Sequence, residues 1–393
     1  MMKKTTYSFA ILVLLLVQIA CRLTDVPAMP TQGETSATKT PKPKVEKPTV
    51  SLDLAQSNQK VDQFFARFVG AHTPGGVVIV LRDGKTLYQA AYGLSNLKRG
   101  TPLSVESVMH IGSVGKQMTA LALMVLAEEG KLKYDDPVSK YVPELKHFGD
   151  DFTIRHLLHH TSGLRDYNAA LEDRLYARAA YPTNADLVAV LSQMKGPARR
   201  PGAAFEYSNP GYELLAVVIE RVAKQPFPKF MQTRIFDPLG MTHTFSLPNP
   251  TRRADPLVAM SYTGSSAAPE AYPSDDFDGL YGSGSIYTTL GDMALYDEAL
   301  YTGALVSTDT LQEAFQPAKL NNGKTEPYGF GWELETYQGQ SYVAHSGGWL
   351  GFNSDYVRFP DEHFSVIALL NRDYGYPDEP RIALKVASFY LNP

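Results

Sequence analysis

The stretch SVGKQMTALALMVLAEEG, residues 113–130, carries the strongest helical pattern of the chain. Apolar residues recur at helical spacing from Leu121 to Leu126, and Gly130 is a typical helix stop. Ser113 opens this predicted helix, so its hydroxyl would lie at a helix end where backbone N–H groups are unpaired. Lys116 falls one turn later on the same face, within reach of the hydroxyl. The plain alternative is a serine that only caps the helix.

The spacing Ser-x-x-Lys is a weak signal when it is taken alone. It also begins at Ser36, Ser57, Ser95 and Ser192. Ser36 lies in sequence rich in proline, threonine and lysine, and Ser95 and Ser192 lie in polar, turn-like sequence. Ser113 differs from these because it precedes a long apolar helix, and this setting makes it the candidate nucleophile.

Two further motifs lie at the edges of predicted elements. Tyr207-Ser208-Asn209 precedes an apolar helical stretch at 212–222, and His345-Ser346-Gly347 follows a strand-like stretch at 341–344. Each motif is weak by itself, since similar tripeptides occur elsewhere in the chain. Their order after Ser113 and Lys116 is the informative feature.

The regular elements outside these motifs predict a sheet made from both ends of the chain. Residues 77–81 and 86–91 read as a hairpin around an Asp-Gly turn, and 351–358 and 364–371 read as adjacent strands. Helical patterns cover 58–69 and 380–391. The sequence between these ends is mostly helical and rich in loops.

In combination, Ser113-x-x-Lys116, Tyr207-x-Asn209 and His345-Ser346-Gly347 resemble the serine β-lactamase and penicillin-binding superfamily. The Tyr-x-Asn form is similar to the branch that contains class C β-lactamases, D-Ala-D-Ala carboxypeptidases, D-aminopeptidases and family VIII-type esterases. Stretches at 157–164, 235–241 and 328–332 support the resemblance, which runs from about Val61 to the C-terminus. It implies an α/β (α+β) fold, with an antiparallel sheet flanked by helices and a mostly helical subdomain.

The resemblance implies acyl transfer through a covalent acyl-enzyme, with Ser113 as the nucleophile. Lys116 or Tyr207 can accept the serine proton only if its pKa is lowered, which for a lysine moved to about 7 requires about 4–5 kcal/mol from the surroundings. Lys116 is the cation best placed to lower the pKa of Tyr207. We therefore expect Tyr207 to be the base and Lys116 its electrostatic partner, and the opposite assignment stays open.

The resemblance also implies the substrate contacts. The backbone N–H groups of Ser113 and Gly348 would hold the oxyanion, beside Gly347, and Asn209 would orient the substrate and hold Lys116. His345-Ser346-Gly347 stands where penicillin-recognising members carry Lys-Thr-Gly. A neutral histidine has one donor and no fixed charge at pH 7, so His345 is expected to grip a substrate carboxylate poorly.

We therefore expect a serine hydrolase that acts on a small ester, an amide or a D-amino-acid peptide. A true β-lactamase or D,D-carboxypeptidase is the alternative. A second alternative is a sensor that keeps the fold and binds peptides without catalysis.

The first fifty residues predict export. Residues 1–20 have a basic start and an apolar run, which is typical of a signal peptide. The position of Cys21 resembles that of a lipoprotein cysteine, so a lipid anchor is expected there, with an ordinary signal peptide as the alternative. Residues 21–50 form a Pro/Thr/Lys-rich tether expected to be disordered. The hydrolase domain then covers 51–393, with a sheet subdomain at about 51–112 and 235–393 and a helical subdomain at about 113–234. The protein is expected to be extracytoplasmic.

Composition excludes several other functions. The chain has 393 residues, a formal net charge of -4 and one cysteine. This charge argues against a broad electrostatic grip on nucleic acid, and one cysteine excludes an intrachain disulfide or a thiolate metal cluster. His156, His159 and His160 cluster, but without an acidic residue or a His-Glu-x-x-His pattern. No metal and no cofactor is expected.

Overall fold

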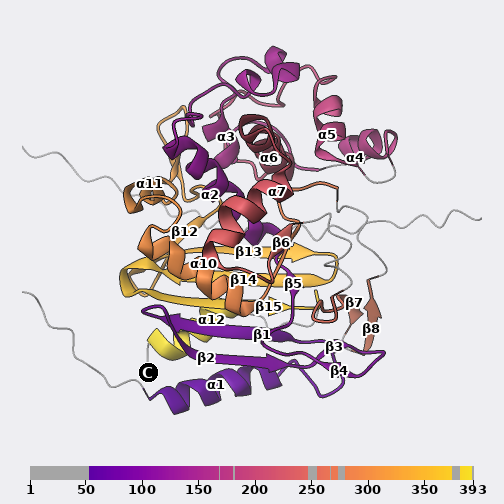
Figure 1. The fold of residues 1–393 in the computed structure, drawn as a ribbon, viewed down its shortest axis with the longest axis vertical. Coiled ribbons are helices and arrows are strands. Elements are labelled where there is room, and N and C mark those ends of the chain that lie inside the picture. Colours follow the sequence, from indigo (N-terminus) through magenta and orange to yellow (C-terminus); the bar gives the residue numbers. More distant parts are fainter. Residues whose placement is uncertain are drawn as a thin grey trace, which may run out of the picture. The chain divides into compact units, whose positions relative to one another are not determined.

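A six-stranded antiparallel sheet joins segments from near both ends of the described chain (Figure 1), in the order β12-β13-β14-β15-β1-β2. β1 (Gly76–Arg82) and β2 (Lys85–Tyr92) form the predicted hairpin. Asp83 and Gly84 between them both have positive φ, 51° and 69°, as a tight two-residue turn requires. The other strands are β12 (Glu333–Tyr337), β13 (Gln340–Trp349), β14 (Phe352–Phe359) and β15 (Phe364–Leu370).

The computed structural model describes residues 53–167, 169–179, 182–246, 255–265, 267–272, 279–373 and 381–391. The predicted signal peptide and tether therefore lie outside the described residues. Within the described ranges, no helix is both long enough and apolar enough to cross a bilayer.

Each face of the sheet carries its own apolar cluster, because alternate residues of a strand point to opposite faces. β1 pairs with β15 so that Val80 faces Val366 and Ile79 faces Ile367. The face that carries Val80 and Val366 packs with α1 (Leu54–Ala66) and α12 (Ile382–Leu391). The face that carries Ile79 and Ile367 belongs to the larger cluster, which continues into the helices. The helical predictions at 58–69 and 380–391 are confirmed as elements, although α1 begins and ends a few residues earlier than predicted.

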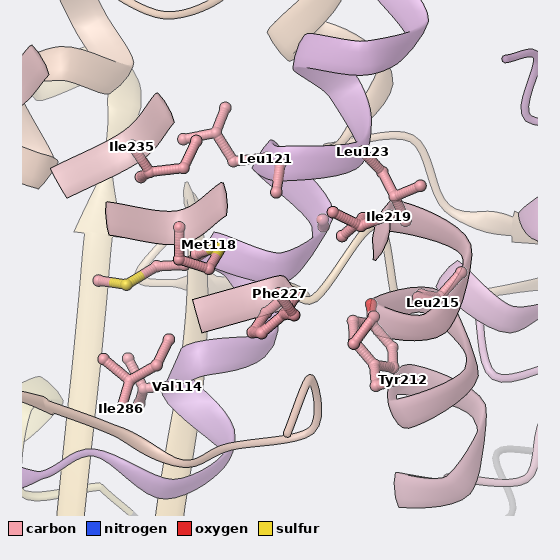
Figure 2. Packing of buried hydrophobic residues seen from close by; sticks show 14 of the residues in the cluster. Val114, Met118, Leu121, Leu123, Tyr212, Leu215, Ile219, Phe227, Ile235 and Ile286 are labelled. Carbon is pink, nitrogen blue, oxygen red and sulfur yellow. The ribbon is translucent and has the colours of Figure 1, made fainter. Parts of the chain in front are cut away.

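The helix predicted from residue 113 is buried along nearly its whole length. It is α2 (Gly115–Glu128), and it packs against α6 (Asn209–Ala223). Figure 2 shows side chains of both helices, among them Leu123 and Ile219, in the larger cluster. The described residues from Asp53 onward belong to one compact unit, so the sheet and the predicted helical subdomain share a continuous core.

The remaining elements are shorter and connect these parts. The helices are α3 (Ile154–Leu158), α4 (Ala169–Tyr176), α5 (Asn184–Leu191), α7 (Phe227–Met231), α8 (Asp237–Leu239), α10 (Leu290–Thr302) and α11 (Thr308–Glu313). The tight 3₁₀ turns are η1 (Gly112–Val114), η2 (Val138–Lys140), η3 (Pro143–Phe148) and η5 (Pro360–Glu362), and η4 (Gln232–Phe236) is a π-helical turn. The short strands are β3 (Leu94–Asn96), β4 (Thr101–Pro102), β5 (Met109–His110), β6 (Phe245–Ser246), β7 (Tyr262–Ser265), β8 (Ala268–Ala271), β9 (Ile286–Thr288), β10 (Ala318–Lys319) and β11 (Thr325–Glu326).

Two predicted boundaries are wrong by a few residues. Ser113 does not open α2 but lies in the preceding 3₁₀ turn η1, which packs against β13. His345-Ser346-Gly347 does not follow a strand but lies inside β13. That strand continues to Trp349 because β14 pairs with it as far as Phe352.

Candidate active site

Ser113 lies on a turn wedged between the start of α2 and strand β13. The turn follows β5, and the backbone N–H of Gly112 donates to Nδ1 of His110 at 2.9 Å. A Cβ on Gly112 would lie 2.8 Å from the backbone nitrogen of Gly348, so the turn passes very close to β13. Position 112 therefore requires glycine for two reasons, the positive φ and this close approach. This close approach places the turn that carries Ser113 beside the backbone of Gly348.

Lys116 is fully buried behind the serine. Its Nζ lies 3.0 Å from Ser113 Oγ, and it donates to Asn209 Oδ1 at 2.7 Å and to the backbone oxygen of Ser283 at 2.7 Å. Burial lowers the pKa of Lys116 to about 7, although the charges of Asp166 and Glu213 act in the opposite direction. The structure thus brings together Ser113, Lys116 and Asn209, which the sequence placed in separate motifs.

The partners of Lys116 suit a neutral amine that faces the serine. A backbone oxygen accepts hydrogen bonds and cannot donate, so Ser283 takes one N–H. Asn209 turns its oxygen to Lys116 because its Nδ2 donates to Asp166 Oδ2 at 3.3 Å. A neutral amine has two N–H groups and one lone pair. With both N–H groups given to Ser283 and Asn209, the lone pair points to the hydroxyl of Ser113, as a general base requires.

Tyr207 lies next to both Ser113 and Lys116, and its side chain hydrogen bonds to Ser113. Burial raises the pKa of Tyr207 well above its usual value, and the bond to Ser113 offsets only part of this rise. Lys116 Nζ lies over the tyrosine ring, 4.8 Å from its centroid. These observations oppose the expectation that Tyr207 is the base, since desolvation disfavours a phenolate. They favour Lys116, the assignment that the sequence left open.

Asp166 and Glu213 are two acidic residues of the site that the motifs did not reveal. Asp166 accepts hydrogen bonds from the backbone and side-chain nitrogens of Asn209, at 2.9 and 3.3 Å. Glu213 of α6 is 2% exposed and accepts from Ser283 Oγ at 2.8 Å. A charged residue inside the apolar stretch 212–222 was the only sequence signal for Glu213. Ser283 lies in a segment without any periodic pattern.

His345 is held by other protein groups rather than aimed at open space. Its Nε2 is 3.0 Å from the hydroxyl of Tyr328, and its Nδ1 is 2.5 Å from the backbone oxygen of Ser346. The side chain is 2% exposed. Burial and the charge of Lys116 lower the pKa of His345 to about 3, so the ring is neutral. Both ring nitrogens of His345 are therefore engaged by protein groups.

A directional chain of hydrogen bonds fixes the proton positions of this histidine. The backbone N–H of Ser208 donates to His160 Nδ1 at 3.1 Å, so the proton of the neutral His160 ring is on Nε2. That Nε2 lies 3.2 Å from the Tyr328 hydroxyl, which can then donate to His345 Nε2. His345 Nδ1 carries the remaining proton and donates a hydrogen bond to the Ser346 backbone oxygen. The chain ties the Tyr207–Asn209 segment to β13.

Gly347 and Gly348 differ in how closely they are packed. A Cβ on Gly347 would collide with the backbone oxygen of Ile111, which also accepts from Ser354 Oγ at 2.6 Å. A Cβ on Gly348 would meet no described atom within 4 Å. Gly347 therefore permits the contact between β13 and the turn η1. Gly348 takes part in this contact through its backbone nitrogen.

The histidine cluster at 156–160 serves structural contacts. His156 is hydrogen bonded to Thr153, and His159 Nδ1 lies 3.0 Å from the Tyr328 backbone oxygen. His160 belongs to the chain of hydrogen bonds between Ser208 and His345. Among the described residues, no group of three or more histidine, cysteine or acidic side chains is arranged to hold a metal ion.

One known protein family matches most of this chain. The model of the family described as Beta-lactamase matches residues 61–390, which is most of the chain. The chain belongs to the beta-lactamase family. The family assignment confirms the resemblance and the fold class inferred from the sequence, a sheet with flanking helices and a helical part.

Several beta-lactamase family relatives are similar over most of the chain. Penicillin-binding protein 4* of Bacillus subtilis is 32% identical over 81% of this chain and 73% of its own length. A D-aminopeptidase of Cereibacter sphaeroides is 29% identical over 82% of this chain, which spans only 61% of that protein. Among solved structures, the octameric penicillin-binding protein homologue from Pyrococcus abyssi has a TM-score of 0.74 and 26% identity, over 86% of this chain and 78% of that one.

Proposed function

We propose that this chain hydrolyses an ester or amide bond through a covalent acyl-enzyme on Ser113. The observation that carries the proposal is the buried Lys116, whose two N–H groups are taken by acceptors and whose remaining position faces the serine hydroxyl. Ser113 Oγ attacks the substrate carbonyl while Lys116 takes its proton. The proton then passes to the leaving alcohol or amine, and a water molecule cleaves the acyl-enzyme by the same steps.

The backbone at the turn supports the same reaction. The carbonyl oxygen becomes negative in the tetrahedral intermediate and needs donors placed in advance. We assign this role to the N–H groups of Ser113 and Gly348, whose segments approach each other through Gly112. Asn209, held by Asp166, presents its amide beside Lys116 and would orient the substrate.

The proposed substrate is a small ester or a peptide that contains a D-amino acid. Relatives named as a penicillin-binding protein and a D-aminopeptidase support this class. The neutral, fully engaged His345 offers no fixed positive charge to a substrate carboxylate. This favours substrates that can bind without a contact between their carboxylate and β13, and it disfavours β-lactams.

The test is hydrolysis of short p-nitrophenyl esters, D-alanyl p-nitroanilide and a chromogenic cephalosporin by the chain and its Ser113→Ala variant. We expect turnover of an ester or the anilide, and a loss of at least about 10³-fold in kcat in the variant, because the nucleophile is removed. Mass spectrometry should detect the acylated Ser113 peptide in the unaltered chain.

Ser95→Ala is the matched control, because Ser95 also begins a Ser-x-x-Lys stretch but lies in β3, where its hydroxyl donates to the Thr101 oxygen. It should keep full activity. Equal rates for Ser113→Ala and the unaltered chain would refute the proposal, and preference for the cephalosporin would replace the proposed substrate class.

A further inference from the structure

The carbonyl group that binds Lys116 belongs to a segment held from two sides. Ser283 supplies this carbonyl, and Thr119 Oγ1 of α2 donates to the neighbouring Gly282 oxygen at 2.8 Å. Gly282 has a φ of 111° and lies so close to α6 that a Cβ there would collide with the Tyr212 oxygen. The position of the Ser283 oxygen is therefore set by contacts that do not involve Lys116.

Glu213 provides the second anchor of this segment. Its Oε1 accepts from Ser283 Oγ at 2.8 Å, and its Oε2 accepts from the Tyr167 hydroxyl. Both partners are hydroxyl groups, which can donate to a carboxylate or accept from a carboxylic acid. The same contacts can thus persist in either protonation state of Glu213.

We propose, on the basis of the function above, that Glu213 is a positioning residue for the catalytic base. It holds the Ser283 carbonyl on the amine of Lys116, and its buried negative charge sets the pH below which that amine becomes charged. Glu213 acts through Ser283 and through space, and it contacts no reacting atom.

Several other ionisable groups face Lys116, and each must be weighed. They are Asp166 and His160 from the connection after α3, Tyr207 before α6, Tyr212 and Glu213 on α6, and His345 on β13. Burial keeps both histidines neutral and both tyrosines protonated. Asp166 and Glu213 remain as the negative charges that favour a charged amine.

Glu213 titrates in the same range as the amine of Lys116. Burial raises the pKa of Glu213 to about 7, although its two hydroxyl partners lower it. Two interacting groups with similar pKa values lose their protons as a pair. Removal of the carboxylate should therefore lower the pKa of Lys116.

The experiment uses Glu213→Gln, which keeps the shape and removes the charge. The pKa of Lys116 is read from the ¹³Cε signal of the labelled lysine, assigned by its absence in Lys116→Met. We expect the titration midpoint to fall by about 1 pH unit. The acid limb of kcat/KM should move by the same amount.

Glu220→Gln is the matched control, because Glu220 lies two turns later on α6 and accepts from Tyr281 and from the Phe227 nitrogen. It should leave the midpoint unchanged. Ser283→Ala is the second variant in case Glu213→Gln does not fold. Loss of its hydroxyl removes a bond that lowers the pKa of Glu213, so the Lys116 midpoint should fall in the same direction by a smaller amount.

The possible outcomes separate this inference from the proposed function. A Lys116 midpoint that stays in place in both variants overturns the role of Glu213, even if the unaltered chain turns over substrate. Lower kcat without a shifted acid limb also overturns it, because that is the result of a merely structural residue. A shifted midpoint in a chain that hydrolyses none of the substrates supports the electrostatic role and refutes the proposed function.

Discussion

Lys116 is subject to two opposing influences, since burial lowers its pKa while Asp166 and Glu213 raise it. The net change from 10.5 to about 7 corresponds to about 4–5 kcal/mol against the charged amine. Desolvation therefore outweighs the two acidic neighbours. The amine is left with a pKa near neutrality, where a general base is most effective.

In the proposed mechanism, the pH dependence of catalysis follows from Lys116. Below its pKa Lys116 is protonated and cannot accept the serine proton, so kcat/KM should fall about tenfold per unit below a midpoint near pH 7. Tyr207→Phe should lower kcat but keep this midpoint, because the phenol is not the group that titrates. Stopped-flow rates measured across the pH range would check both statements. Disappearance of the acid limb in Tyr207→Phe would assign the base to Tyr207 after all.

The sequence predicted the residues of the proposed reaction but not their surroundings. Ser113, Lys116 and Asn209 were found because short motifs hold them at fixed spacings next to strong helices. Ser283 belongs to no motif, and only the folded chain brings its oxygen to Lys116. The choice between Lys116 and Tyr207 also needed the structure, because it depends on how much water each side chain loses.

Among the elements, the approach of β13 to the turn η1 does most to shape the site. The two segments meet at Gly347 and Ile111, with Ser354 of β14 bound to the same Ile111 oxygen. A side chain at position 347 is excluded because its Cβ would collide with the Ile111 backbone oxygen and with Ser354 Oγ.

Adjacent glycines provide a test of this contact. Gly347→Ala should reduce kcat by about 10²-fold or more, since its Cβ collides with the Ile111 oxygen and displaces one segment, and with it one oxyanion donor. Gly348→Ala should stay within a few fold, since the new methyl group has room and the N–H group is kept. Steady-state kinetics and the melting temperature of both variants would check this. Similar kcat values for the two variants would contradict the close contact.

Strong local patterns predicted most of the long elements. The hairpin, α2, α6 and the last two strands follow from alternation or helical spacing within a few residues. The errors lie where tertiary contacts decide. Pairing with β14 extends β13 past His345, and the expected helix start at Ser113 is a 3₁₀ turn that packs against β13.

At the scale of the whole molecule, buried neutral histidines link stability to pH. Burial lowers the pKa of His159 to about 4 and that of His345 to about 3. In the unfolded chain both return to about 6.5. As the pH falls from about 6.5 towards these values, the unfolded chain binds protons that the folded chain does not. The free energy of unfolding should therefore decrease on acidification, by about 1.4 kcal/mol per unit for each histidine.

His159→Asn isolates this effect. Urea unfolding at pH 7 and at pH 5 should show that the variant loses about 2 kcal/mol less than the unaltered chain over this interval, because one titrating group is gone. The comparison of variants cancels the opposite contribution of Glu213 and Asp355, whose pKa values burial raises to about 7. His72→Asn, at an exposed position, is the control. Equal losses in all three proteins would contradict the buried-histidine account.

We further propose that the chain is exported and anchored through Cys21. In a bacterial host, the unaltered chain should label with radioactive palmitate and enter the detergent phase of a Triton X-114 extract. Cys21→Ser should do neither. A chain that stays in the aqueous phase without label would identify an ordinary signal peptide or none.

The order of the sheet has a consequence for how the protein is made. β15 (Phe364–Leu370) lies between β14 and β1 (Gly76–Arg82), so the first strands of the sheet cannot be completed until almost the whole chain has been synthesised. Contacts between such distant segments form slowly, and an unpaired strand edge is a site of aggregation meanwhile. Premature termination before β15 leaves two groups of strands without the strand that joins them. Such a fragment should be cleared by proteases rather than accumulate.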